Sequence, residues 1–227
     1  ELAPWLNNTL VGTRAPHLVD RTLALLRPLG IHPGVPCFDL PTDPDGEEFA
    51  ERLCRECQMS ENFLVLNPGA GWPSKLWPTQ SYARVAKYLG ERLQRRSLIT
   101  WAGPQEHGMA QAIVSAANGH ALMAPRTSVT QLVALLRRAS GFVGSDTGPL
   151  HLAAAVGTPC VALFGPTSPV ASGPYGRGHQ CLVGESSASA FASKRRGPNT
   201  AMRTIEPQRV IEACELLRPK PDALAAA

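Results

Sequence analysis

From Asn62 onward, short apolar segments alternate with longer segments that carry apolar residues at helical spacing. The expected strands are residues 63–66, 97–101, 121–123, 141–144 and 159–164. The expected helices are residues 80–93, 106–117, 129–138, 148–156 and 207–217, the third with Ser128 as its N-cap. Strands and helices that alternate in this way form parallel sheets with right-handed crossovers. The pattern therefore predicts an α/β fold with a doubly wound parallel sheet, which binds ligands at the carboxyl ends of its strands.

The residues before this alternation differ in character. Residues 17–29 carry leucines at helical spacing and precede Gly30, a residue type that often ends helices. The prolines of residues 31–45 favour an extended connector. We expect a domain boundary near residue 60. Residues 1–13 show no repeating apolar pattern, so we expect the sequence to start inside a longer protein.

The composition excludes several classes of protein. Apolar residues make up 44% and charged residues 18% of the 227 residues, as in globular rather than disordered or coiled-coil chains. The formal net charge of +4 includes no concentrated basic stripe, which argues against nucleic acid as a partner; we interpret Lys194–Arg196 as a solvated loop. The sequence shows neither a signal peptide nor an apolar run of the roughly 20 residues that cross a membrane, so we expect a cytoplasmic protein.

The six cysteines are scattered, and we expect reduced thiols. Cys54 and Cys57 form a CxxC pair, which could bind zinc or act in redox chemistry. Residues 47–59 look helical, however, and no second pair of metal ligands follows. The simpler interpretation is that both side chains belong to one helix face, and we predict no metal site.

The loop after the first expected strand has the composition of an anion-binding loop. It reads NPGAGWPSKLWP over residues 67–78, and its glycines let a ligand approach the backbone while Lys75 offers a positive charge. The loop lacks the spacing of a Walker phosphate-binding loop, so a plain long turn is the alternative.

The segment GSDTGPLH, residues 144–151, leads from a strand directly into a helix. A helix start presents unpaired backbone N–H groups and the positive end of the helix dipole, which together bind phosphate. Asp146 or Thr147 can cap this helix, Gly148 begins it, and His151 lies one turn further on the same side. The alternatives are that Asp146 acts only as a cap and that His151 is an ordinary packed or surface residue.

Two more loops follow expected strands. Glu106 opens the helix after residue 101, where its carboxylate either complements the helix dipole or accepts hydrogen bonds from ribose hydroxyls. Residues 164–169 form a rigid turn that we expect to line the same site.

Together these segments resemble the ADP-heptose lipopolysaccharide heptosyltransferases, glycosyltransferase family 9. The likeness is carried by residues 67–78, 103–106, the TS..L segment from Thr127 and, above all, SDTGPLHLAAAVGTPCVALFGPTSP from Ser145. Members of this family have two Rossmann-like domains in the GT-B arrangement, the first mainly for the acceptor and the second mainly for the nucleotide-sugar. The resemblance implies that residues 1–60 are the tail of a first domain and a Pro-rich linker, and that residues 61–227 are a Rossmann-like nucleotide-sugar-binding domain.

The resemblance also implies roles for individual residues. The implied nucleotide-sugar-binding set is Lys75, Glu106, Met123, Thr127, Asp146, Thr147, Gly148 and His151. In this set Lys75 contacts the diphosphate, Glu106 the ribose, and Met123 and Thr127 lie near the adenine; Lys75 and Asp146 are the catalytic candidates. The family inverts configuration without a metal or other cofactor, and a carboxylate of the first domain deprotonates the acceptor hydroxyl. No such carboxylate can be assigned here, so we expect this chain alone to bind nucleotide but to transfer little or no sugar.

Three functions fit these observations. The leading hypothesis is an inverting glycosyltransferase that moves a heptose or related sugar from an ADP-sugar donor to a lipid-linked lipopolysaccharide core acceptor, in peripheral contact with the cytoplasmic side of a bacterial inner membrane. The alternatives are a non-catalytic nucleotide or saccharide-binding module and a GT-B sugar-nucleotide epimerase. The Ser/Ala-rich residues 186–193 stand where many relatives carry cysteines, which leaves the acceptor open.

Overall fold

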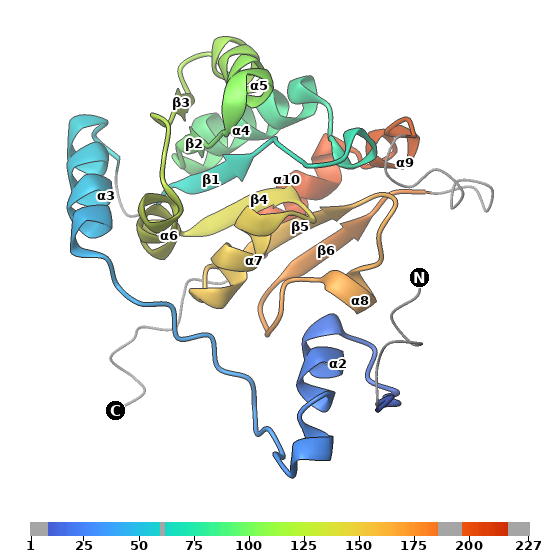
Figure 1. Ribbon diagram of the computed structural model, residues 1–227. Coiled ribbons are helices and arrows are strands. Elements are labelled where there is room, and N and C mark those ends of the chain that lie inside the picture. The colour runs from blue at the N-terminus through green and yellow to red at the C-terminus, as the bar shows by residue number, and fades with distance from the viewer. Residues whose placement is uncertain (1–8, 60–61, 186–196, 218–227) are drawn as a thin grey trace.

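The computed structural model describes residues 9–59, 62–185 and 197–217, so Lys194–Arg196 and residues 186–193 lie outside the described residues. The strands within these ranges are β1 (Leu64–Asn67), β2 (Ser97–Ile99), β3 (Ala121–Met123), β4 (Gly141–Ser145), β5 (Cys160–Phe164) and β6 (Gln180–Val183). They form one parallel sheet in the order β3-β2-β1-β4-β5-β6 (Figure 1). This is the strand order of a Rossmann fold, which confirms the expected doubly wound α/β class.

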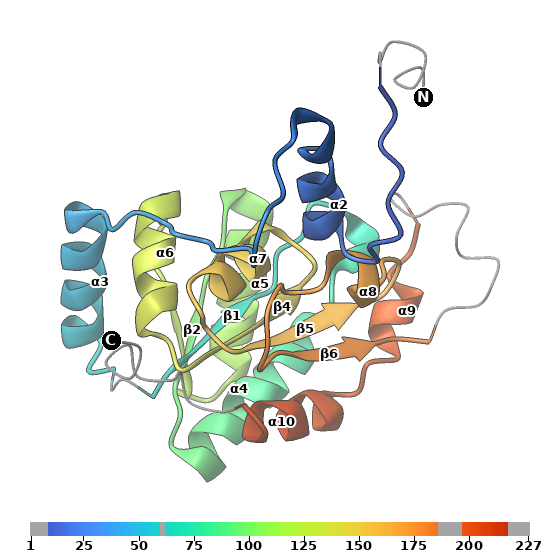
Figure 2. The same ribbon diagram turned by 90° about the horizontal axis from the view of Figure 1, so that it is seen from below.

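Helices cover both faces of the sheet (Figure 2). One face packs against α4 (Thr79–Leu93), α5 (Gly103–Ala116) and α10 (Pro207–Glu215). The other packs against α3 (Pro44–Glu56), α6 (Val129–Arg138) and α7 (Gly148–Ala155). The shorter helices are α2 (Leu18–Ala24), η1 (Arg27–Leu29), η2 (Pro73–Lys75), α8 (Pro169–Ser172) and α9 (Thr200–Arg203).

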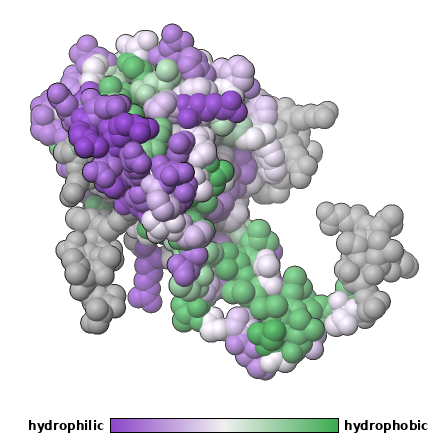
Figure 3. Space-filling view, turned by 60° about the vertical axis from the view of Figure 1, so that its left-hand side comes forward, coloured by the Kyte–Doolittle hydropathy of each residue, from purple (hydrophilic) through white to green (hydrophobic). Residues whose placement is uncertain are grey.

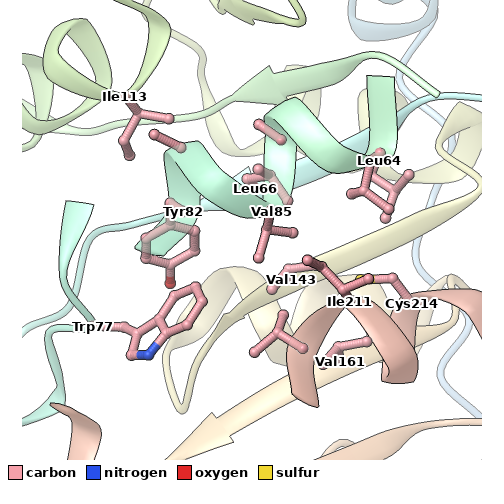
Figure 4. Packing of buried hydrophobic residues seen from close by; sticks show 14 of the residues in the cluster. Leu64, Leu66, Trp77, Tyr82, Val85, Ile113, Val143, Val161, Ile211 and Cys214 are labelled. Carbon is pink, nitrogen blue, oxygen red and sulfur yellow. The ribbon is translucent and has the colours of Figure 1, made fainter. Parts of the chain in front are cut away.

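Successive residues of β1 point to opposite faces and enter different cores. Leu64 and Leu66 lie in the core under α4 and α10, whereas Val65 lies in the core under α3 and α6. Both faces are covered, which explains why the strands read as continuous apolar runs rather than alternating ones. In the core under α4 and α10, the rings of Trp77 and Tyr82 make an edge-to-face contact, with 4.8 Å between their centroids (Figure 4).

Most of the expected helices and strands are present, with shifts of a few residues at their ends. The N-cap role of Ser128 is confirmed, because its Oγ accepts a hydrogen bond of 3.1 Å from the Gln131 backbone N–H and the Gln131 side chain accepts one of 2.9 Å from the Ser128 N–H. Residues 17–29 do not form one helix. They break into α2 and η1, because Pro28 has no N–H to continue an α-helix.

The sequence pattern missed β6, α8 and α9. β6 is a short strand at the edge of the sheet, and its side chains are only partly covered. Its four residues follow a loop rich in glycine and proline and show no long apolar run. Pairing with β5, rather than local sequence, therefore creates this strand.

α3 precedes the boundary expected near residue 60 and buries Ala50 and Leu53 in the core that α6 also lines. Cys54 and Cys57 pack partly against this core, and burial raises the pKa of the Cys54 thiol despite the opposing charge of Arg138. This packing favours the helix-face interpretation of the CxxC pair. In the part of the chain that the structure describes, no helix has the length and apolar character needed to span a membrane.

Candidate nucleotide-binding site

The strand order brings two of the loops singled out above together. β1 and β4 are parallel neighbours, and the sheet extends from them in opposite directions. The crevice outside the carboxyl ends of such a pair is the usual ligand site of a doubly wound sheet. The loop of residues 67–78 follows β1, and Asp146 and Thr147 follow β4, so both loops border this crevice. A hydrogen bond of 2.7 Å from Ser145 Oγ to the Lys75 carbonyl ties them together.

Lys75 and Asp146 form a buried ion pair at this edge. The Lys75 ammonium donates to the Asp146 carbonyl over 2.9 Å and to Asp146 Oδ2 over 2.8 Å. The two side chains are only 12% and 7% exposed, so solvent screens their attraction weakly. The same ammonium lies 4.4 Å from the centroid of the Trp72 ring, a cation–π contact. Lys75 is therefore not the free charge that its place in the loop suggests, but half of a fixed pair.

The Asp146 carboxylate also accepts hydrogen bonds from two other side chains. His151 Nε2 lies 3.3 Å from Oδ1, and Ser172 Oγ donates to Oδ2 over 3.1 Å. Burial by itself raises the pKa of Asp146, but hydrogen bonds from the side chains of His151, Lys75 and Thr167 and the charge of Lys75 outweigh burial and hold that pKa well below its usual range. The carboxylate is thus ionised at neutral pH.

Asp146 is not the cap of α7. The N-cap position belongs to Thr147, and no side chain makes a capping hydrogen bond there. The Thr147 hydroxyl instead donates to the Ser145 carbonyl over 3.2 Å. In the first turn of α7, Pro149 has no N–H and the Leu150 N–H donates to the Thr147 carbonyl over 3.1 Å. The start of α7 therefore offers an anion the Gly148 N–H and the positive end of the helix dipole.

A cavity of about 400 Å³ lies between these loops and the starts of α5 and α6. Four of the eight predicted binding residues line it, namely Glu106, Thr127, Thr147 and Gly148. The loop after β1 contributes its glycines to the same wall. Lys75, Asp146 and His151 do not line this cavity; they form a hydrogen-bonded cluster that joins it through Thr147, the residue after Asp146. Met123, at the end of β3 and 37% exposed, does not line this cavity.

Glu106 does two things at once. Its Oε2 accepts a hydrogen bond of 2.6 Å from the Ala102 N–H at the start of α5, as the helix-dipole interpretation requires. Its carboxylate also lies against Gly69 and borders the cavity. A Cβ at residue 69 would overlap that carboxylate, so any larger residue there would displace the Glu106 side chain. The Glu106 carboxylate therefore bonds to the start of α5 and borders the cavity at the same time.

Three residues that sequence reasoning did not select belong to the site. Trp72 lies under the Lys75 ammonium, and Trp101 lines the cavity with its indole N–H bonded to the Ala124 carbonyl over 2.7 Å. Ser172 holds Asp146 from α8. The two tryptophans lie in the loops already singled out, so proximity to Lys75 and Glu106 could have suggested them. No local signal marks Ser172.

Comparison with known proteins gives a consistent result. The family model of glycosyltransferase family 9 (heptosyltransferase) matches residues 3–199. Lipopolysaccharide heptosyltransferase 1 of Pseudomonas aeruginosa is 31% identical over 179 residues, which cover 71% of this chain and 50% of that protein. Lipopolysaccharide heptosyltransferase 3 of Escherichia coli K12 is 30% identical over 165 residues, which cover 68% of this chain and 45% of that protein. The chain thus spans about half the length of the curated relatives it matches.

Solved structures agree in fold. A family 9 glycosyltransferase from Veillonella parvula superposes with a TM-score of 0.78 at 24% identity, covering 92% of this chain and 62% of that one. The Escherichia coli heptosyltransferase WaaC with ADP gives a TM-score of 0.69 at 21% identity, covering 96% and 62%. At these identities the likeness shows the fold alone.

Proposed function

Because this chain belongs to glycosyltransferase family 9, the heptosyltransferase family, we propose that it supplies the donor-binding half of an inverting glycosyltransferase. The reaction moves a heptose or related sugar from an ADP-sugar to a lipopolysaccharide core acceptor. Residues 61–227 form the nucleotide-sugar-binding domain in this proposal, and residues 1–60 are the tail of a first domain and a linker, whose α3 packs into the core of the sheet domain. The names of the relatives, which are lipopolysaccharide heptosyltransferases, support the substrate class. A lipid-linked acceptor also places the enzyme on the cytoplasmic side of the inner membrane, in peripheral contact with it.

One observation carries the donor assignment: the Lys75–Asp146 pair lies next to the start of α7, beside a cavity of about 400 Å³. This volume lies within the range typical of small-ligand sites, about 300 to 1,000 Å³. A diphosphate at this point meets the start of a helix and one ammonium. The nucleoside then extends along the cavity toward Glu106 and Thr127, with Glu106 facing the ribose.

The chemistry follows from where charge develops. As the bond between the sugar and the diphosphate breaks, negative charge accumulates on the leaving ADP. The start of α7 and the Lys75 ammonium stabilise that charge, and because both are fixed before the reaction they need little reorganisation. No metal or other cofactor enters this proposal, since these two groups supply the positive charge.

Asp146 holds Lys75 rather than moving a proton. Its pKa, lowered by His151 and Lys75 against the effect of burial, makes the carboxylate a weak base and leaves it no proton to donate at neutral pH. The base that activates the acceptor hydroxyl comes from the first domain in this proposal. His151 contacts the far oxygen of Asp146 and completes the cluster.

Isothermal titration calorimetry tests the donor assignment directly. ADP, AMP and adenosine are titrated into the 227-residue chain, and UDP and GDP report on the base. We expect ADP to bind more tightly than adenosine, since the diphosphate meets α7 and Lys75. Absence of ADP binding at millimolar concentration refutes the proposal that the nucleotide belongs to this half.

A further inference from the structure

Ser172 donates a hydrogen bond to one carboxylate oxygen of the Lys75–Asp146 pair, although it does not line the nucleotide cavity. It is the last residue of α8, and its Oγ donates to Asp146 Oδ2 over 3.1 Å, a shorter contact than the 3.4 Å to the Ser168 carbonyl one turn earlier. The same Oδ2 accepts the 2.8 Å hydrogen bond from the Lys75 ammonium. The two donors fix the rotation of the carboxylate, and the carboxylate fixes the ammonium. Ser172 therefore reaches the diphosphate site only through Asp146.

The turn that follows Ser172 is fastened to α2 and to the segment after it. The Tyr175 hydroxyl donates to Asp20 Oδ1 over 2.8 Å, and His17 Nε2 bonds to the Gly173 carbonyl over 3.0 Å. The Tyr175 ring also makes edge-to-face contacts with His17, at 4.9 Å between centroids, and with Phe38, at 5.6 Å. Residues 17–38 thus meet the sheet domain at the turn that Ser172 begins.

Elsewhere α2 is loosely attached. An apolar cavity of about 370 Å³ lies between α2 and α7, with Leu18 and Leu23 on one side and Ala155 on the other. The ribbon shows α2 set apart from the helices that cover the sheet (Figure 1). The hydrophobic surface in the lower part of Figure 3 lies over α2 and its flanking segments, where Leu18, Leu25 and Leu29 are exposed. The contacts of Tyr175 with His17, Asp20 and Phe38 therefore attach residues 17–38 to the sheet domain.

We propose that Ser172 is a positioning residue for the Lys75–Asp146 pair, and that Tyr175 keeps Ser172 in place by holding its turn against α2. The diphosphate role of the pair rests on the proposed function; the positioning itself does not. Without the Ser172 hydroxyl, Oδ2 has one side-chain donor in place of two. Asp146 then rotates more freely toward His151, and the ammonium moves with it.

Ser172→Ala tests the positioning role, with Ser168→Ala as its matched control. Ser168 is the N-cap residue of the same short helix, is exposed, and makes no side-chain capping hydrogen bond. We expect Ser172→Ala to weaken ADP binding about tenfold, the size expected for one lost hydrogen bond to a charged group, and to change adenosine binding less than about twofold. Ser172→Thr should restore ADP binding, because it keeps the hydroxyl and the neighbouring cavity has room for the methyl group. Unchanged ADP binding in Ser172→Ala, or equal losses for ADP and adenosine, overturns the proposal.

Tyr175→Ala, alone and combined with Ser172→Ala, tests whether Tyr175 keeps Ser172 in place. If Tyr175 acts through Ser172, Tyr175→Ala weakens ADP binding and the double variant is no weaker than Ser172→Ala alone. Multiplied losses in the double variant show independent effects and overturn this half of the proposal.

A ligand-free measurement separates this inference from the proposed function. The ¹⁵Nζ resonance of the Lys75 ammonium should shift in Ser172→Ala and stay in place in Ser168→Ala. If the wild-type chain binds no ADP, the nucleotide assignment fails, while this resonance still decides whether Ser172 positions the pair. No shift in Ser172→Ala refutes the positioning role.

Discussion

At the scale of residues, the site depends on a pair rather than on a single cation. Lys75 and Asp146 are 71 positions apart in the chain, and their charges lie 2.8 Å apart at the start of α7. Removing one partner of a buried pair leaves the other unpaired, which costs more than the pair contributes. Lys75 and Asp146 should therefore not behave as independent binding residues.

A double-mutant cycle tests this dependence. Lys75→Ala should weaken ADP binding about 100-fold, because it removes a cation and leaves the Asp146 carboxylate facing the diphosphate. Adding Asp146→Asn should recover part of that loss, since the repelling charge is gone. Calorimetry with ADP and adenosine measures both effects, and Lys87→Ala, a half-exposed lysine of α4, is the matched control. Losses that simply multiply in the double variant contradict the paired arrangement.

Asp146 should also make the stability of the chain depend on pH in acid. Its folded pKa lies below its unfolded value, so the stabilisation is fully present above the unfolded pKa of about 4 and is lost as pH falls below it toward the folded pKa. A carboxylate of this kind contributes about 2 kcal/mol at neutral pH.

Urea denaturation at pH 7 and pH 3 measures this contribution. Because the folded pKa of Asp146 lies well below 3, only part of this contribution is lost by pH 3, so Asp146→Asn should reduce the difference in free energy of unfolding between the two pH values by about 1 kcal/mol. Asp39→Asn, at an exposed position, should leave the difference unchanged. An Asp146→Asn variant with the full wild-type pH dependence argues against the lowered pKa.

At the scale of elements, the site is made by the ends of strands and the starts of helices. The loop after β1, the start of α5 and the start of α7 all border one cavity, although they lie far apart in the chain. The close approach of the loop to α5 depends on Gly69, where the Glu106 carboxylate occupies the space of a side chain.

Gly69→Ala should therefore destabilise the chain by about 1 to 3 kcal/mol, the usual cost of forcing an extra group into a packed place. Gly71→Ala, in the same loop, is the control, because a Cβ there meets no atom within 4 Å. Thermal and urea unfolding measure both. Equal stability of the two variants would show that Glu106 moves aside at little cost.

At the scale of the whole molecule, the chain spans about half the length of its curated relatives. In the proposed reaction the donor site and the acceptor base belong to different domains, so binding and transfer should separate. We expect the 227-residue chain to bind ADP and to release no ADP from ADP-heptose in the presence of a lipopolysaccharide core acceptor.

A coupled assay for released ADP measures this, with a full-length family 9 heptosyltransferase as the positive control. Turnover by the 227-residue chain comparable to that of the control would refute the assignment of the base to another domain. ADP binding without turnover also fits the non-catalytic binding module, and transfer after a first domain is supplied distinguishes the two functions.

Much of the fold follows from the sequence because its signals are local. The change from apolar runs to helical spacing defined five of the strands and the helices between them, and Ser128 marked the start of α6. The same alternation predicted that the loops at the carboxyl ends of the strands would share one edge. Such signals fail where neighbours decide the structure, as at β6, which exists by pairing with β5.

The sequence alone determined the doubly wound sheet and most of the candidate residues, because periodicity and loop chemistry are properties of short segments. Only the tertiary structure decided which of those residues meet. The strand order places the loops of Lys75 and Asp146 side by side. The fold also brings Ser172 into hydrogen-bonding contact with Asp146, 26 positions earlier in the chain, and leaves Met123 outside the cavity. These contacts depend on the order of strands in the sheet and on side-chain directions, which no short segment encodes.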